Sequence, residues 1–356
     1  MFFVAITRGK RQVRLSYFLN EYGKKTETLT PSQFVAESVL DFTENTPNTV
    51  NFSESDLNWA HLNILMKSAK PSLEEENMDW INHKLETFTF SPSSIKNILK
   101  CGLSFFYSNI VRIPSAPNEN TAYGNAVHGT MRILIEQFVS EGLWPTEKEL
   151  ISVFHSQMHK FKGNFTEKQF KARTQQGEHL IPLILVNKKD IYLKNRVFKT
   201  EYSLQSTIGN VPVKGSIDKI AIDGNAVQIF DYKTGSTSRM KTDSNLSSKY
   251  NPEKPPANYW FQVGIYGLLI KNKPDLNWEF ISGGIESMTP EDDNTLSVWN
   301  NYYTSEHFEL IEKWVLEADR KLKNKEFFTG CGEDNCYWCN FSKENGLVKH
   351  LPAMED

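Results

Sequence analysis

Apolar and polar side chains alternate along residues 211–233, and this pattern predicts two β-strands joined by a tight turn. Asp223 and Gly224 interrupt the alternation where a two-residue turn would connect antiparallel strands. The first apolar run holds Val211, Val213, Ile217, Ile220 and Ile222, and the second holds Val227, Ile229 and Phe230. We therefore expect an antiparallel hairpin.

Two acids and a lysine, Asp218, Asp231 and Lys233, lie inside these apolar strands. A turn made of Asp223 and Gly224 would place Ile222 opposite Asn225, Asp218 opposite Ile229 and Asp231 opposite Ser216. Alternate and opposed residues share a face, so the three charged side chains should project from one side, with the acids roughly 7–8 Å apart at the backbone. One cation could then bridge them. The alternative is a solvated polar face, but aspartate has poor strand propensity, which favours a functional role.

Two further segments show helical periodicity and carry candidate ligands. Residues 123–138 present His128, whose neutral imidazole suits divalent metals. Residues 259–270 place Gln262 and Tyr266 at positions i and i+4, where they could grip a nucleic-acid backbone or a base edge. Taken alone, each has a simpler explanation: a packed or solvated histidine, and an ordinary surface or core pair.

In chain order, four motifs resemble those of the RecB-type branch of the PD-(D/E)XK nucleases. They are Gly124-x3-His128, Gly215-x2-Asp218, Asp231-Tyr232-Lys233-Thr234-Gly235 and Gln262-x3-Tyr266. The stretch from Phe90 to Tyr107 is similar to the start of that family, with Gly102 where proline is usual. The resemblance covers residues 85–345 and implies a nuclease domain there.

The resemblance implies an α/β fold of the restriction-endonuclease type, with a mixed central sheet flanked by helices. It also implies Mg²⁺ or Mn²⁺ as cofactor, because hard oxygen ligands favour these ions. The implied metal ligands are His128, Asp218, Asp231 and the backbone carbonyl of Tyr232, and the implied catalytic residues are Lys233, Asp231 and Asp218. Bound metal would polarise the scissile phosphate and activate a water that Lys233 positions.

Three other residues complete the expected site. Gln262 and Tyr266 are expected to contact the substrate. Glu201, in the strand-like stretch 197–204, is either an additional site acid or a solvated strand residue.

Four cysteines give a second signal. Cys101 stands near the start of the nuclease-like region, and Cys331, Cys336 and Cys339 cluster near its end. This arrangement resembles the iron–sulfur staple of AddB-type nucleases, which joins the two ends of the domain and implies a [4Fe–4S] cluster; zinc is the alternative, because thiolates bind both. The spacing departs from that family, because Asn345 stands where the last cysteine would fall. Either Cys331 replaces the missing ligand, or the cluster has been lost and the thiols are structural.

The N-terminal segment carries another resemblance. The stretch from Phe3 to Tyr17 resembles helicase motif VI of the UvrD/AddA superfamily, in which the arginine at the position of Arg8 reaches the ATP γ-phosphate. The sequence holds no Gly-x4-Gly-Lys-Ser/Thr P-loop, so the chain is not expected to hydrolyse ATP by itself. We expect residues 1–43 to be a helicase remnant and residues 44–84 a connector, within the tail of a longer helicase–nuclease or one half of a split pair. The alternative is a basic surface strand.

Composition narrows the class of protein. The net charge of −3 over 356 residues excludes a globally basic nucleic-acid binder, so DNA contacts must come from local patches. Residues 159–173, which combine basic and phenylalanine side chains, are one candidate patch or a solvated helix face. Residues 236–256 are expected to form a loop beside the site. Without a signal peptide or a membrane-spanning apolar run, we expect a soluble cytoplasmic protein.

These observations predict a Mg²⁺- or Mn²⁺-dependent deoxyribonuclease, expected to be an exonuclease. Its substrate would be single-stranded DNA or duplex ends in repair, recombination or end processing, with the ATPase part of a UvrD/AddA-type helicase as partner. The first alternative is a catalytically silent DNA-binding or scaffold module of a helicase–nuclease complex. The second is a partner-docking module that uses the cysteine staple.

Overall fold

The computed structural model describes residues 75–114, 118–192, 197–246 and 258–345. The helicase-like segment 1–43, including Arg8, lies outside the described residues. So does most of the predicted connector, whose described part forms α4 (Glu75–Glu86).

The described strands form one mixed five-stranded sheet in the order β1-β2-β3-β4-β5. They are β1 (Val197–Ile208), β2 (Val211–Asp223), β3 (Ala226–Lys233), β4 (Glu279–Ser287) and β5 (Val298–Asn301). Strands β1, β2 and β3 pair antiparallel, β4 joins β3 in parallel, and β5 closes the sheet antiparallel to β4. The predicted α/β architecture with a mixed sheet is confirmed.

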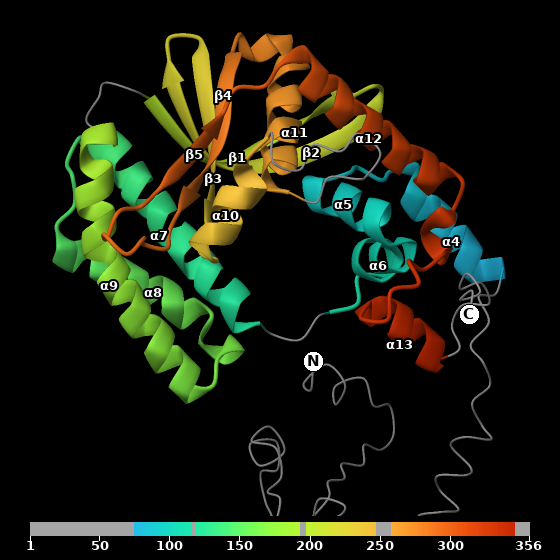
Figure 1. The fold of residues 1–356 in the computed structure, drawn as a ribbon, viewed down its shortest axis with the longest axis horizontal. Helices are drawn as coiled ribbons and strands as arrows, with labels where there is room; N and C mark the ends of the chain where they lie inside the picture. The colour runs from blue at the N-terminus through green and yellow to red at the C-terminus, as the bar shows by residue number, and fades with distance from the viewer. Residues whose placement is uncertain (1–74, 115–117, 193–196, 247–257, 346–356) are drawn as a thin grey trace, which may run out of the picture. The chain divides into compact units, whose positions relative to one another are not determined.

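Helices cover both faces of this sheet (Figure 1). The larger helices are α5 (Pro92–Lys100), α7 (Glu119–Glu141), α8 (Glu147–Lys160), α9 (Glu167–Tyr192), α11 (Tyr259–Lys271) and α12 (Ser305–Lys323). The shorter ones are α6 (Gly102–Phe105), η1 (Phe106–Val111), η2 (Lys162–Asn164), α10 (Thr237–Ser244), η3 (Pro274–Leu276), η4 (Glu326–Phe328) and α13 (Tyr337–Asn345).

Each face of the sheet has its own apolar core. Helices α5, α11 and α12 pack on one face, and α7, α8 and α9 pack on the other. The first core includes Ile95, Ile220, Ile229, Leu269 and Ile311, and the second includes Val127, Phe154, Ile184, Ala221 and Tyr232. Strand β3 therefore contributes side chains to both cores, which places its polar residues next to helices from both layers.

The hairpin prediction is confirmed for β2 and β3, but the predicted register is wrong. Asp223 pairs with Ala226, so Gly224 and Asn225 form the turn. Gly224 has a φ of 63°, a left-handed conformation that glycine adopts without steric cost. Because the register moves by two residues, each side chain keeps its predicted face of the sheet.

The helical predictions at His128 and Gln262 are confirmed by α7 and α11. The loop expected over residues 236–256 is wrong in part, because α10 occupies its first half. Met240 of α10 is fully buried, so one apolar contact anchors an otherwise polar helix that composition alone does not reveal.

A cluster of three charged side chains is buried within the second core. Lys188 of α9 and Lys219 of β2 are each 1% exposed, and Glu286 of β4 is 2% exposed. Glu286 pairs with Lys219 and lies 3.4 Å from the Nζ atom of Lys188. Burial disfavours the carboxylate of Glu286, but the two lysines outweigh burial and lower its pKa. We call this group the buried ion cluster.

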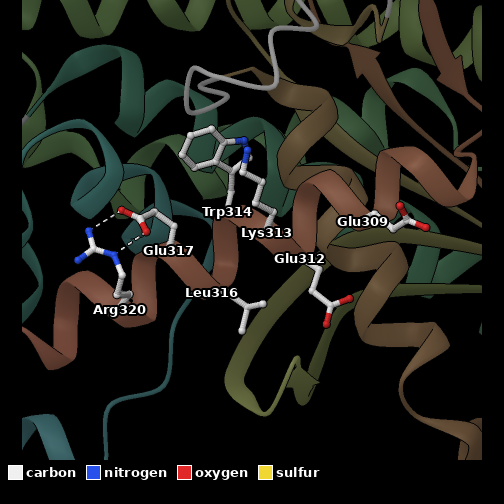
Figure 2. A pocket seen from close by; sticks show the side chains of 7 residues that line it. All are labelled: Glu309, Glu312, Lys313, Trp314, Leu316, Glu317 and Arg320. Carbon is white, nitrogen blue, oxygen red and sulfur yellow. Dashed lines mark hydrogen bonds and ion pairs between the residues drawn. The ribbon is translucent and has the colours of Figure 1, made fainter.

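The outer face of α12 carries a surface depression lined by seven residues between Glu309 and Arg320 (Figure 2). Glu317 and Arg320 form an ion pair at 2.7 Å beside it. The residues predicted for catalysis do not line this depression. In the described part of the chain, no helix is both long and apolar enough to cross a membrane.

Candidate active site

The ends of β2 and β3 bring the two predicted acids together. The regular pairing of these strands ends at Lys219 opposite Phe230, and the next pair along would be Asp218 and Asp231. The acids are therefore level with each other, rather than diagonal as the predicted register had them. Asp218 is 9% exposed and Asp231 is 3% exposed. The backbone N–H of Tyr232 donates a hydrogen bond of 2.7 Å to Asp218 Oδ2, which fixes one carboxylate to the neighbouring strand.

Lys233 and the α11 residues complete one side of the site. Lys233 forms an ion pair with Asp231, and its Nζ lies 5.1 Å from the centre of the Tyr259 ring. Gln262 Nε2 donates to Asp231 Oδ1 at 2.7 Å and lies 3.1 Å from the Tyr266 hydroxyl. The i, i+4 pair therefore lies beside the acids, where it orients Asp231.

A glycine allows α11 to approach β2 this closely. An added Cβ at Gly215 would lie 2.5 Å from Cε1 of Tyr266, a distance that real contacts do not show. Any larger residue would displace the Tyr266 ring and with it the Gln262 contact. This packing gives the Gly215-x2-Asp218 motif a structural reason.

His128 reaches the same site from α7 on the other layer. Its Nε2 lies 3.0 Å from the carbonyl oxygen of Tyr232, and its Nδ1 lies 3.4 Å from Asp218 Oδ2. Both neighbours are hydrogen-bond acceptors, and a neutral imidazole can donate to only one of them. The second nitrogen therefore requires either a proton or a cation.

Glu201 of β1 stands opposite Asp218 and joins this group. Ligand atoms of His128, Glu201 and Asp218 lie within 4.8 Å of one another. Glu201 has a φ of 45°, in the left-handed region that costs a non-glycine residue about 1–3 kcal/mol. Its pairing with β2 is interrupted between Thr200 and Tyr202. Glu201 is thus a strained acid pointing to the site, and the sequence shows no sign of that strain.

The site holds more carboxyl groups than nearby cations. Burial raises the pKa of Asp231. The charge of Lys233 lowers this pKa, whereas the charge of Asp218 raises it further. Burial and the charge of Asp218 also raise the pKa of Glu201. Burial opposes the charge on Lys233, but Asp231 outweighs burial and raises its pKa, so Lys233 is an ammonium ion. Likewise burial disfavours charged His128, but Asp218 and Asp231 outweigh it and raise its pKa.

The donor set fits a hard divalent ion. Carboxylates from Asp218, Asp231 and Glu201 supply oxygen ligands of the kind that Mg²⁺ and Mn²⁺ prefer, and an imidazole is compatible with Mn²⁺. A neutral His128 leaves one ring nitrogen without a proton beside an acceptor oxygen, and a bound cation would satisfy that nitrogen. PD-(D/E)XK proteins in general use such metals, and the roles of the individual residues stay predictions.

Sequence reasoning missed two residues beside the site. Tyr259 lies under the ammonium of Lys233, and an aromatic residue one turn before Gln262 was the available signal. Lys96 of α5 is half-buried, and burial together with the charge of Lys233 lowers its pKa. Nothing in the sequence around Lys96 indicates this proximity.

Several side chains of the candidate basic patch, residues 159–173, contact other parts of the protein. Arg173 forms an ion pair with Glu119 at 3.0 Å and lies over the Tyr123 ring. Phe165 and Phe170 are partly buried against the second core. The structure therefore favours a packing role for these aromatic side chains.

The four cysteines also come together, between α5 and α13. Cys101 and Cys339 are buried, whereas Cys331 and Cys336 are partly exposed. Their sulfur atoms lie within 4.8 Å of one another, so the predicted gathering of the two ends is observed.

Residues 89–343 match the PD-(D/E)XK nuclease superfamily, and the chain belongs to that superfamily. Among solved structures, a candidate exonuclease from Eubacterium rectale is similar at 14% identity, with 76% of this chain and 92% of that chain covered and a TM-score of 0.46. LHK-Exo in complex with dAMP is similar at 14% identity, with 63% of this chain and 97% of that chain covered and a TM-score of 0.28. A search of curated proteins finds no match. Family membership rests on the sequence match, which spans all of the candidate site.

Proposed function

We propose that this chain is a Mg²⁺- or Mn²⁺-dependent deoxyribonuclease that hydrolyses phosphodiester bonds at single-stranded or duplex ends. The observation that supports it best is the convergence of Asp218, Asp231 and Lys233 at the end of one hairpin, with His128 arriving from the opposite layer. The site contains the carboxyl groups of Asp218, Asp231 and Glu201 but, among the described residues, only one lysine in an ion pair with any of them, Lys233. This excess of negative charge favours the binding of a divalent ion beside a phosphate.

Each side chain has a physical role in this proposal. When bound, the metal supplies Lewis-acid activation of the phosphate and of water. Asp218 and Asp231 would hold the ion, and Asp218 also accepts from the Tyr232 N–H, which keeps its carboxylate in place. The ammonium of Lys233, held by Asp231, donates to the attacking water and balances developing charge. Gln262 keeps Asp231 oriented.

The test compares labelled linear DNA with circular DNA. Linear single-stranded and duplex substrates labelled at either end are incubated with the full chain and Mg²⁺, Mn²⁺ or a chelator. We expect metal-dependent cutting of linear DNA and no cutting of circles, as an exonuclease requires. Cutting of circles would instead establish an endonuclease.

Matched variants locate the site within the hairpin. Asp231→Ala and Lys233→Ala should abolish cutting while DNA binding persists. Asp223→Ala and Lys214→Ala change exposed residues of the same hairpin, in β2, and should cut normally. Cutting by Asp231→Ala would remove the site assignment. Binding without cutting in the unmodified chain would support the silent DNA-binding or scaffold module instead.

We further propose that the nuclease acts with a UvrD/AddA-type ATPase in a RecB- or AddB-like assembly. The motif VI resemblance around Arg8 is its support. Addition of a purified partner ATPase should make degradation dependent on ATP, and an Arg8→Ala chain should lose that dependence while retaining basal cutting. Equal stimulation of both chains would contradict the coupling.

A further inference from the structure

The four thiols lie close enough to share one ion. Cys101 Sγ lies 3.7 Å from Cys339 Sγ and 3.8 Å from Cys336 Sγ, and Cys331 Sγ lies 3.8 Å from Cys339 Sγ. A disulfide requires about 2.05 Å between sulfur atoms. These four cysteines are therefore free thiols whose sulfur atoms all lie within 4.8 Å of one another.

These distances discriminate between the two cofactors that four cysteines commonly hold. A tetrahedral zinc ion with Zn–S bonds of about 2.3 Å sets its sulfur ligands about 3.8 Å apart. In a [4Fe–4S] cluster each thiolate binds a different iron, so the width of the cluster separates the sulfur atoms in addition to the Fe–S bonds. The thiol group fits the single ion and is too contracted for the cluster.

The backbone next to Cys101 maintains this short separation. An added Cβ at Gly102 would lie 2.5 Å from the carbonyl oxygens of both Glu326 and Thr329. A side chain here, including the proline that the family resemblance leads one to expect, would push residues 326–329 away from Cys101. Gly102 thus allows residues 326–329 to lie close to Cys101, and this short separation favours a small metal site.

Backbone donors surround the sulfur atoms. The N–H groups of Ser104 and Glu333 donate to Cys101 and Cys331, respectively, and the N–H of Cys339 donates to Cys336. Burial raises the pKa of Cys101 and Cys331, and these donors act against it by favouring the thiolate, which is the form that ligates metal. The stacked rings of Tyr107 and Trp338, 5.0 Å apart, lie beside this site.

We propose that Cys101, Cys331, Cys336 and Cys339 bind a single zinc ion, which joins α5 and α6 to α13 in place of a [4Fe–4S] cluster. In this proposal, the unusual position of Cys331 in the sequence accompanies a change of cofactor. Cys331 supplies the fourth ligand from a position that suits a single ion. The proposal rests on the thiol geometry and does not depend on DNA cleavage.

Metal content is the first test. The full chain is purified anaerobically from cells supplied with both iron and zinc, and zinc, iron and acid-labile sulfide are measured per chain. We expect about one zinc ion per chain, as a structural site with four thiolate ligands requires, without sulfide or the visible absorption of an iron–sulfur cluster. Stoichiometric iron with sulfide would overturn the proposal, and so would a chain that carries no metal.

Cobalt and three variants sharpen the test. Co²⁺ in place of zinc should give the absorption of tetrahedral thiolate coordination. Cys336→Ser should lose the ion and melt at lower temperature, whereas Tyr337→Ala, at an exposed neighbouring position, should keep it. Gly102→Ala retains all four thiols but should release zinc at lower chelator concentration. Full zinc retention by Cys336→Ser would contradict the ligand assignment whether or not the other variants fold.

Discussion

Lys219 and Asp218 are adjacent residues of β2, but their side chains enter two charged groups of different kinds. Lys219 enters the buried ion cluster, where two lysines enclose Glu286 and every member is at most 2% exposed. Asp218 enters the candidate active site, where the carboxyl groups of Asp218 and Glu201 lie near each other and Lys233 forms its ion pair with Asp231. The side chains of His128 and Lys233 there are 26% and 22% exposed.

The balance of charge distinguishes the two groups: it is compensated in the buried ion cluster and uncompensated in the candidate active site. The buried ion cluster leaves no carboxylate for an outside cation, because both lysines compensate Glu286. The active-site group has an excess of carboxyl groups and an opening to solvent. Of the two groups, only the second therefore has the excess of carboxyl groups and the exposure that binding of a divalent ion and a phosphate would require.

The largest effect should come from Asp218→Asn, which keeps the size of the side chain but removes the negative charge of a proposed metal ligand. Loss of several kcal/mol of transition-state stabilisation corresponds to a fall in cleavage rate on the order of 10³-fold or more. Single-turnover cleavage at saturating Mg²⁺ measures it, with Asp223→Asn as the control in the same strand. A rate within about tenfold of the unmodified chain would mean that Asp218 is no more functional than the buried ion cluster.

Glu286→Gln should act on stability instead. It leaves two buried ammonium groups uncompensated, and breaking a buried ion pair typically costs about 3–5 kcal/mol. Urea unfolding should show this loss, while the rate per folded molecule stays unchanged. Glu309→Gln, an exposed change on α12, should alter the free energy of unfolding by less than about 0.5 kcal/mol. A Glu286→Gln protein that is stable but inactive would erase the distinction between the two groups.

The pH dependence of stability provides a finer comparison. Because folding lowers the pKa of Glu286, the contribution of the buried ion cluster is fully present above the ordinary value of 4.5 and is lost as pH falls through the lowered pKa of the folded state. The difference in unfolding free energy between the unmodified chain and Glu286→Gln should therefore shrink with acidification below pH 4.5. A difference that grows on acidification would show that the lysines do not stabilise this carboxylate.

Gln262→Ala should give the smallest effect. Gln262 holds Asp231 without being an expected metal ligand, and loss of such a partner typically costs about 10–100-fold in metal affinity or activity. Cleavage measured against Mg²⁺ concentration should show a weaker apparent affinity for the metal. Tyr266→Phe retains the ring against Gly215 and serves as the control for packing. Unchanged metal dependence in Gln262→Ala would leave the residue a purely structural contact.

The sequence predicted the faces of the hairpin better than its register. The register error of two residues left Asp218 and Asp231 on one face, because side chains alternate with a period of two. The contact of His128 with Tyr232 crosses 104 residues, and only the family resemblance anticipated it. The positive φ of Glu201 coincides with the interruption of β1–β2 pairing between Thr200 and Tyr202, which no local pattern encodes.

The buried ion cluster escaped prediction for a similar reason. Lys219 and Glu286 occupy strand positions that resemble solvated polar sites, and tertiary packing buries them, with Tyr192 of α9 and Phe230 of β3 against Lys219. The helix α10 was missed because its single apolar anchor, Met240, contributes little to a polar stretch. In both cases tertiary contacts override the local pattern.

The four thiols also bear on whether two fragments of the chain would separate after proteolysis. Gly163, between α8 and α9, is exposed and has open space around its Cα. A single proteolytic cut there would leave Cys101 on one fragment and Cys331, Cys336 and Cys339 on the other. If the thiols hold the proposed ion, separation of the fragments would require release of that ion as well as opening of the cores, so the nicked protein should come apart only when a chelator and a denaturant are both present.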